Sequence, residues 1–130
     1  MENKHSFYAT LTANVFVNDN DFDFIYECFK GHYDFTIKAS AERGGFLCRL
    51  RSRRVKFYYS EIITDEDRIL DLSISQIQLI MKSLEMHDTG QASDIYLRFN
   101  KIHNELVQKQ NGLNEKSSQW TAELTNKSKQ

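Results

Sequence analysis

Proline is missing from this sequence, and cysteine is scarce. The 130 residues include no proline, and the two cysteines, Cys28 and Cys48, each lie within an apolar pattern. Tight turns must therefore rely on glycine, asparagine, aspartate and serine. Two such cysteines do not make the framework of a disulfide-stabilised secreted protein, because a free thiol among apolar residues packs as a small hydrophobic side chain. We therefore expect a reducing, cytoplasmic setting.

Long apolar runs are missing as well. No stretch reaches the roughly 18 apolar residues that a membrane-spanning helix needs. Residues 1–30 lack the positively charged segment and apolar run of a secretory signal. We therefore expect neither export nor insertion into a membrane.

The usual sequence markers of catalysis do not occur. There is no phosphate-binding glycine loop, no G-x-S-x-G turn and no H-E-x-x-H helix. Cys28 and His32 lie four residues apart, but a structural zinc site usually needs four ligands. The remaining cysteine and histidines show no paired spacing. We predict a non-catalytic protein with no metal site and no cofactor.

Positive charge is concentrated in one segment. Five of the seven arginines fall between Arg43 and Arg54, and the segment from Arg43 to Lys56 carries six positive charges and no negative one. Because the net charge of the whole chain is −1, the other residues together carry −7. Arginine presents a planar set of donors that suits phosphate and carboxylate groups. The clustering therefore predicts a surface that binds an anionic partner.

The first third of the chain predicts a strand followed by a helix. Residues 6–17 are apolar at every second position, which is the period of a half-buried strand, and helical spacing begins near Asn20. Two ends of this helix are possible. It either continues to the pair Gly44 and Gly45, which we favour, or ends at Gly31 and gives way to a strand over residues 33–39.

The basic segment alternates between apolar and charged residues. Apolar side chains at 46, 48 and 50 alternate with arginines, and after Ser52 the alternation resumes through Tyr59. This period predicts a hairpin over residues 46–59 with one apolar face and one basic face. The turn lacks the Asn-Gly or Asp-Gly pair that favours a tight hairpin. We predict that anions bind through Arg43, Arg49, Arg51, Arg53, Arg54, Lys56 and Tyr58.

The second half of the chain predicts a strand and two helices. Residues 68–73 form a short strand, and Ser73 with Gln76 fits the capping box that opens a helix through Leu84. A further helix should end at Gly112 and should be followed by a flexible polar tail over residues 113–130. We expect its apolar stripe to pack on the preceding helix, and a homodimer through the same surface is the alternative. The stripe consists of Ile95, Phe99, Ile102 and Leu106.

Together these patterns predict a single α+β domain over residues 1–112. A small antiparallel sheet is covered by the early helix and is followed by a C-terminal helical hairpin. The function we expect is that of a small regulatory or inhibitory protein that binds nucleic acid or a nucleic-acid-binding protein. The alternatives are an oligomeric assembly protein or a binder of a small phosphorylated ligand. The compact size and two-sided charge would suit an accessory protein of a phage or mobile element.

Overall fold

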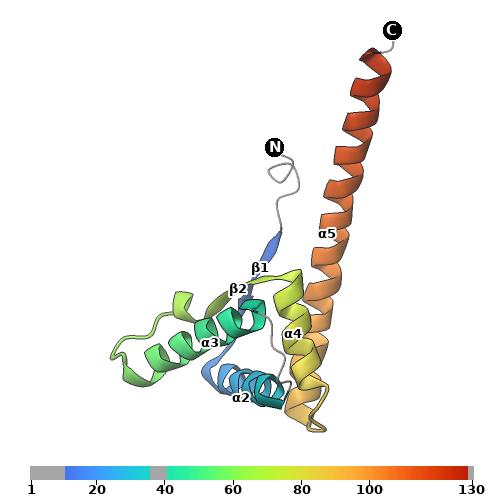
Figure 1. Ribbon diagram of the computed structural model, residues 1–130. Coiled ribbons are helices and arrows are strands. Elements are labelled where there is room, and N and C mark those ends of the chain that lie inside the picture. The colour runs from blue at the N-terminus through green and yellow to red at the C-terminus, as the bar shows by residue number, and fades with distance from the viewer. Residues whose placement is uncertain (1–10, 36–40, 129–130) are drawn as a thin grey trace.

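A computed structural model describes residues 11–35 and 41–128 of the chain (Figure 1), and the side chains after Lys116 are not described. Two strands form the sheet, β1 (Thr12–Phe16) and β2 (Ile69–Ser73). The helices are α2 (Asp19–Phe35), α3 (Ala41–Tyr59), α4 (Ile74–Leu84) and α5 (Gly90–Ser128), and a short 3-10 helix, η1 (Glu66–Arg68), precedes β2. The predicted α+β class, with its early helix and C-terminal helical hairpin, is confirmed.

The two strands pair antiparallel, with Asn14 opposite Asp71 at the centre. The apolar residues of one face point into the core, where Val15 and Leu72 are buried. The opposite face carries Phe16 and Ile69, which lie opposite each other and are exposed. Both strands fall within segments predicted as strands. The earlier part of the first predicted strand, residues 6–10, lies outside the described residues.

Helix α2 begins at Asp19, close to the start predicted near Asn20. The Oδ1 atom of Asn18 accepts a 2.8 Å hydrogen bond from the backbone N–H of Asp21, which satisfies one of the free donors of the first turn. Apolar residues spaced three and four apart then face the core, and Phe22, Ile25 and Phe29 are almost completely buried.

Both predicted ends of this helix are wrong. Helix α2 passes through Gly31 and ends at Phe35, so residues 33–35 are not a strand, and residues 36–40 lie outside the described part. A separate helix, α3, begins at Ala41, so the glycine pair 44–45 lies in its first turns instead of capping an earlier helix. Glycine costs about 1 kcal/mol relative to alanine inside a helix, which packing at neighbouring positions offsets.

The predicted basic hairpin is also wrong, because residues 46–59 belong to α3. The alternation that suggested a strand overlaps with helical spacing. Phe46, Leu47 and Leu50 are all buried, whereas a strand would have turned Leu47 outward and Cys48 inward. Burial of two adjacent residues and a third three positions later is what one face of a helix requires.

The C-terminal half forms a helical hairpin. The capping box is present: the N–H of Gln76 donates to Ser73 Oγ (3.3 Å) and the N–H of Ser73 donates to Gln76 Oε1 (3.0 Å). Helices α4 and α5 pack on one another, and Ile95, Phe99 and Leu106 of the predicted stripe are buried while Ile102 is partly buried. The stripe therefore serves the core of the chain itself.

Helix α5 does not end at Gly112. It continues to Ser128, so the segment predicted as a polar tail is helical through that residue and projects beyond the rest of the fold (Figure 1). A single glycine weakens a helix without breaking it, and the Leu113, Glu115 and Lys116 that follow have good helix propensity. No helix in the described part of the chain is both long and apolar enough to cross a membrane.

Candidate binding surface on helix α3

The helical turn of α3 divides its basic residues into two rows instead of presenting one face. We call Arg49, Arg53 and Lys56 the β2-side row, because they reach toward η1 and β2. We call Arg51, Arg54 and Tyr58 the α2-side row, because they reach toward α2. Between the rows runs an uncharged outer ridge, which consists of Cys48, Ser52, Val55 and Tyr59, all exposed. The predicted continuous basic face is therefore wrong.

The two arginines of the β2-side row bind the free edge of the sheet. Nη1 of Arg53 donates to the carbonyl of Ile69 (3.1 Å) and to that of Asp67. Nη2 of Arg49 donates to the carbonyl of Asp71 (3.2 Å). Along β2, backbone groups point alternately toward β1 and away from it. The carbonyl of Arg68 points toward β1, where it accepts a 2.8 Å hydrogen bond from the N–H of Val17. The carbonyls of Asp67, Ile69 and Asp71 therefore point away from β1.

The match between helix and strand has a geometric basis. Residues four apart on a helix are separated by about 6 Å along its axis, and residues two apart on a strand by about 6.8 Å. Arg49 and Arg53 can therefore each reach a successive outward carbonyl of β2. A free strand edge exposes unpaired backbone groups, and these two guanidinium groups cover the carbonyls of this one.

The third member of the β2-side row, Lys56, forms an ion pair with Asp67. The other carboxylate oxygen of Asp67 accepts hydrogen bonds from the N–H (2.9 Å) and Oγ1 (3.1 Å) of Thr64. The ammonium of Lys56, followed by the donors of Thr64, lowers the pKa of Asp67 to about 2. This carboxylate therefore neutralises part of the basic segment and fixes the loop before η1.

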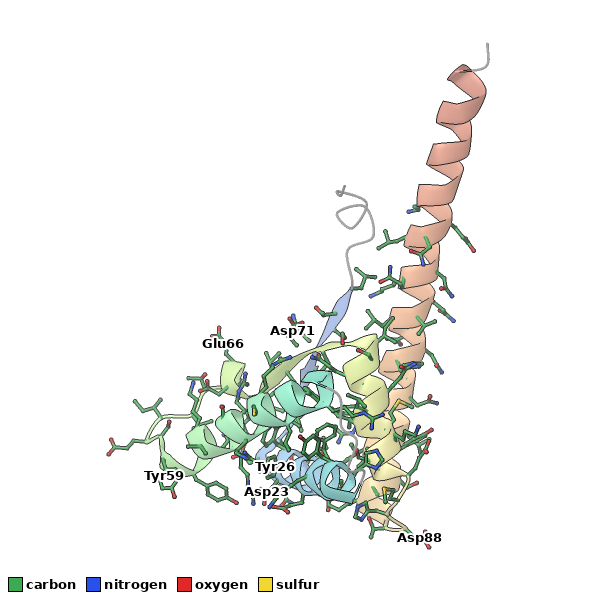
Figure 2. The ribbon with its side chains drawn as sticks, in the orientation of Figure 1. Asp23, Tyr26, Tyr59, Glu66, Asp71 and Asp88 are labelled. Carbon is green, nitrogen blue, oxygen red and sulfur yellow. The ribbon has the colours of Figure 1, made fainter. Side chains whose placement is uncertain are left out.

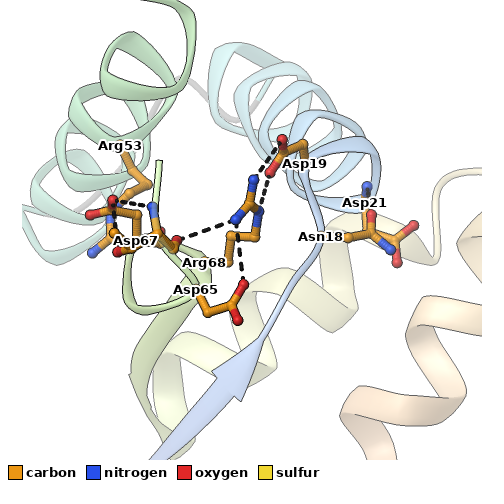
Figure 3. Close-up of polar contacts among 8 residues, drawn as sticks. Asn18, Asp19, Asp21, Arg53, Asp65, Asp67 and Arg68 are labelled. Carbon is orange, nitrogen blue, oxygen red and sulfur yellow. Dashed lines mark hydrogen bonds and ion pairs between the residues drawn. The ribbon is translucent and has the colours of Figure 1, made fainter. Parts of the chain in front are cut away.

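The acidic clusters of the sequence meet basic residues of the same chain. Figure 3 shows Arg68 between two carboxylates: its Nε donates to Asp19 Oδ1 (2.8 Å) at the start of α2, and its Nη1 lies 3.5 Å from Asp65. The hydrogen bond to Asp19 is the main reason that the pKa of Arg68 is raised. The contact joins the beginning of β2 to α2. Basic and acidic residues that form separate clusters in the sequence thus form ion pairs with each other in the folded chain.

Arg54 is the most heavily engaged residue of the α2-side row. Its Nη1 donates to Glu27 (2.5 Å), and its Nε lies 3.0 Å from Asp23, at an angle that makes an ion pair without a hydrogen bond. The guanidinium also lies 4.6 Å from the ring centroid of Tyr26 and 5.4 Å from that of Tyr58. The contacts join α3 to α2, and cation–π contacts of this kind each contribute about 0.5 to 1 kcal/mol.

The other predicted binding residues are dispersed. Nε of Arg51 donates weakly to the hydroxyl of Tyr26 (3.4 Å), and the hydroxyl of Tyr58 donates to Asp23 (3.4 Å). Arg43 lies half-buried near the start of α3. Burial first, and then the charges of Arg43 and Lys82, lower the pKa of His32. The structure therefore does not gather the seven predicted residues into one patch.

The sequence did not point to the exposed apolar end of α3. Tyr59 is 83% exposed and Ile62, just after the helix, is 78% exposed, with Val55 and Tyr58 also exposed. Figure 2 shows Tyr59 at the end of α3 that lies farthest from α4 and α5. The spacing of 48, 52, 55 and 59 is a helical stripe, so it could have been recognised once the segment was read as a helix.

A shallow depression lies on the β2 side of the ridge. Its lining consists of Cys48, Arg49, Ser52, Arg53 and Lys56, so it combines three cationic side chains with a hydroxyl and a free thiol. Among the residues that the structure describes, no group of three or more His, Cys, Asp or Glu side chains could hold a metal ion.

The chain has no match in the comparisons with known proteins: no protein family, no curated protein and no solved structure matches it. The surface of α3 must therefore be interpreted from its own geometry.

Proposed function

We propose that this chain is a small non-catalytic binding protein, regulatory or inhibitory in its role, whose partner contacts the outer ridge of α3. The partner we favour is a protein that handles nucleic acid and carries acidic groups around an apolar patch. Nucleic acid itself is the weaker candidate, because Arg53, Arg54 and Lys56 already bind groups of the same chain.

The observation that carries this proposal is that Val55 and Tyr59 of the ridge are exposed, and that Tyr58 of the α2-side row and Ile62, just after the helix, are exposed as well. Exposed apolar residues that lie together on a monomer often mark an interaction site, and tyrosine and arginine are enriched at the energetic centres of interfaces. Here an uncharged centre is flanked by basic rows, which is the usual arrangement of an apolar interface core and a polar rim. The cytoplasmic setting and the link to phages or mobile elements remain part of the same proposal.

The test is capture of a partner by the immobilised full chain from an extract of its native host. The double variant Val55→Glu with Tyr59→Ser changes only exposed side chains and serves as the ridge variant. We expect a protein that binds the wild type, is lost with the ridge variant, and binds again when both proteins are purified. Retention of the same proteins by both chains would contradict the proposal.

Two controls separate the candidate partners. Nuclease treatment of the extract leaves a protein partner bound and removes a contact that depends on nucleic acid. Direct titration of duplex DNA at several salt concentrations gives a log-log slope near −5 if about six phosphates are neutralised. Because so many of the cations are engaged within the chain, we expect a much shallower slope.

A second candidate function rests on the depression beside the ridge. Arg49 and Arg53 are held in place by carbonyls of the β2 edge and line the depression together with Lys56. Preorganised guanidinium groups suit a small phosphorylated ligand. A thermal-shift panel of phosphate and nucleotides tests this, because a ligand at 100 times its Kd stabilises a protein by about 2.7 kcal/mol. No shift with any of them would exclude this function.

A further inference from the structure

His32 lies where the ends of two helices meet the beginning of a third. It belongs to the last turn of α2 and is 9% exposed, and its Nδ1 lies 3.1 Å from Sδ of Met86, shortly after α4. The first turns of α3 pack on the same part of α2, where the rings of Phe29 and Phe46 meet edge to face with their centroids 5.2 Å apart. A change of charge at His32 therefore acts on three helices.

The contact with Met86 determines which ring nitrogen carries the hydrogen. A thioether has no hydrogen to donate, so Nδ1–H of His32 is the donor and Sδ of Met86 is the acceptor. The neutral imidazole therefore takes up a further proton at Nε2, and the buried ring becomes a cation.

Two cations act on this ring from the neighbouring helices. Arg43 is the third residue of α3, and Lys82 lies in the last turn of α4. Burial, and then the charges of Arg43 and Lys82, lower the pKa of His32. A proton on His32 adds a third positive charge to this junction.

Other ionisable groups lie on the same elements. Cys28, one turn earlier on α2, is neutral because burial raises its pKa to about 11. After α4, Glu85 accepts a 3.2 Å hydrogen bond from the hydroxyl of Tyr96 on α5, and the ring of His87 lies 6.0 Å from that of Phe24. Glu85 and His87 thus have contacts of their own at this end of α4.

The part of α3 that carries Arg43 is also its weakest. Gly44 and Gly45 lie in the first turns of α3, and glycine favours a helix less than every other residue except proline. We propose that His32 is a pH-sensitive latch: a proton on Nε2 repels Arg43 and loosens the first turns of α3 from the end of α2. The ridge residues Val55 and Tyr59 lie nearer the other end of α3, so the latch does not depend on the proposed function.

The effect on unfolding has a definite sign. Because the pKa of His32 is lowered in the folded chain, the unfolded chain takes up the proton first as the pH falls below the ordinary value of 6.5. The stabilising effect of the neutral ring is complete above that pH. It is lost as the pH falls from 6.5 to the pKa of the folded chain, a range in which most carboxylates do not titrate.

The first experiment follows proton uptake by NMR of the imidazole ring hydrogens in the full chain, with His32→Gln identifying the resonance. We expect a midpoint below 6.5 for His32. Arg43→Gln and Lys82→Gln should each move this midpoint upward, because each removes a repelling charge. A midpoint at or above 6.5 in the wild type would overturn the proposal.

The second experiment measures the loosening of α3 by amide hydrogen exchange. Protection factors, which correct for the intrinsic effect of pH on exchange, are compared at about pH 7.5 and about pH 5. The amides of residues 45–48 report on the first turns, because they are the first that can bond within the helix. We expect their protection to fall about threefold or more at the lower pH, while the amides of α4 keep theirs.

Two variants separate the latch from a general effect of acid. His32→Gln cannot take up the proton, so the protection of residues 45–48 should be the same at both pH values. Gly45→Ala strengthens the helix at a position with open space for the added carbon, so it should keep the proton uptake and reduce the fall in protection. Equal protection of the wild type at both pH values would refute the latch, as would an equal fall in His32→Gln.

Discussion

The arginines that bind the β2 edge make a prediction about stability. Replacing Arg53 by methionine keeps an unbranched apolar stem and removes every donor. The variant loses two hydrogen bonds, to the carbonyls of Asp67 and Ile69, and leaves the outer ridge of α3 unchanged. If the basic residues of α3 serve the fold as described, Arg53→Met must lower the free energy of unfolding.

The expected size of this loss follows from the position of the bonds. A hydrogen bond to a charged group contributes about 1.5 to 3 kcal/mol when it is protected from water. Both carbonyls lie at the edge of the sheet, where water can replace the guanidinium in the variant, so the two bonds together should be worth only about 1 to 2 kcal/mol. For a chain of this length that corresponds to a decrease in Tm of roughly 4 to 8 °C.

The assay is urea unfolding followed by circular dichroism at low and high salt. The acceptors of Arg53 are neutral carbonyls, so the loss in Arg53→Met should persist at about 0.5 M salt, where exposed ion pairs are largely screened. Lys56→Met is the matched control: it breaks the ion pair with Asp67, and its smaller loss should shrink as salt is added. An Arg53→Met chain that unfolds at the same urea concentration as the wild type would refute the structural role of Arg53.

Three further predictions concern the cap of α4, one carboxylate and the two thiols. Ser73→Ala removes the N-cap acceptor and should lower the free energy of unfolding by about 1 kcal/mol, measured with urea. Because Lys56 holds the pKa of Asp67 at about 2, below the usual 3.8, the stabilising effect of Asp67 is complete above about pH 4. It is lost as the pH falls toward about 2, and thermal unfolding of Asp67→Asn should show a smaller decline over that window. Cys48 is exposed, while burial raises the pKa of Cys28 to about 11, so a thiol reagent at about pH 8 should modify Cys48 alone until the chain unfolds.

Elements with one dominant period were predictable from the sequence. Ser73 and Gln76 mark the start of α4 by a chemical signature that few other arrangements satisfy, and the apolar stripe of α5 fits only a helix. The helical spacing that begins near Asn20 likewise located the start of α2. In each case local hydrogen bonding and the pattern of burial favour the same structure.

The segment that became α3 was ambiguous because two periods overlap in it. Phe46, Cys48 and Leu50 alternate like a strand, and only the burial of Leu47 distinguishes the helix. The arginines could be located in the sequence, but their partners could not. Asp67, Ile69 and Asp71 approach them through the tertiary fold, and all three of these contacts are to backbone carbonyls, which no side-chain pattern reveals.

The candidate surface was hidden by the same ambiguity. A strand over 46–59 turns Val55 and Tyr59 inward, whereas the helix turns them to solvent and makes them the centre of the surface. The correct period would have identified this ridge. It would not have shown that the charged rows beside it are held by contacts within the chain.

The unequal edges of the sheet limit how far copies of this chain could assemble. An open strand edge on each side would let copies add one after another without end, as in fibres. Here guanidinium groups obstruct the β2 edge. Two copies that paired through their β1 edges would therefore have no free edge left. Any association by this route would close at two copies, because Arg49 and Arg53 occupy the outward carbonyls of the other edge.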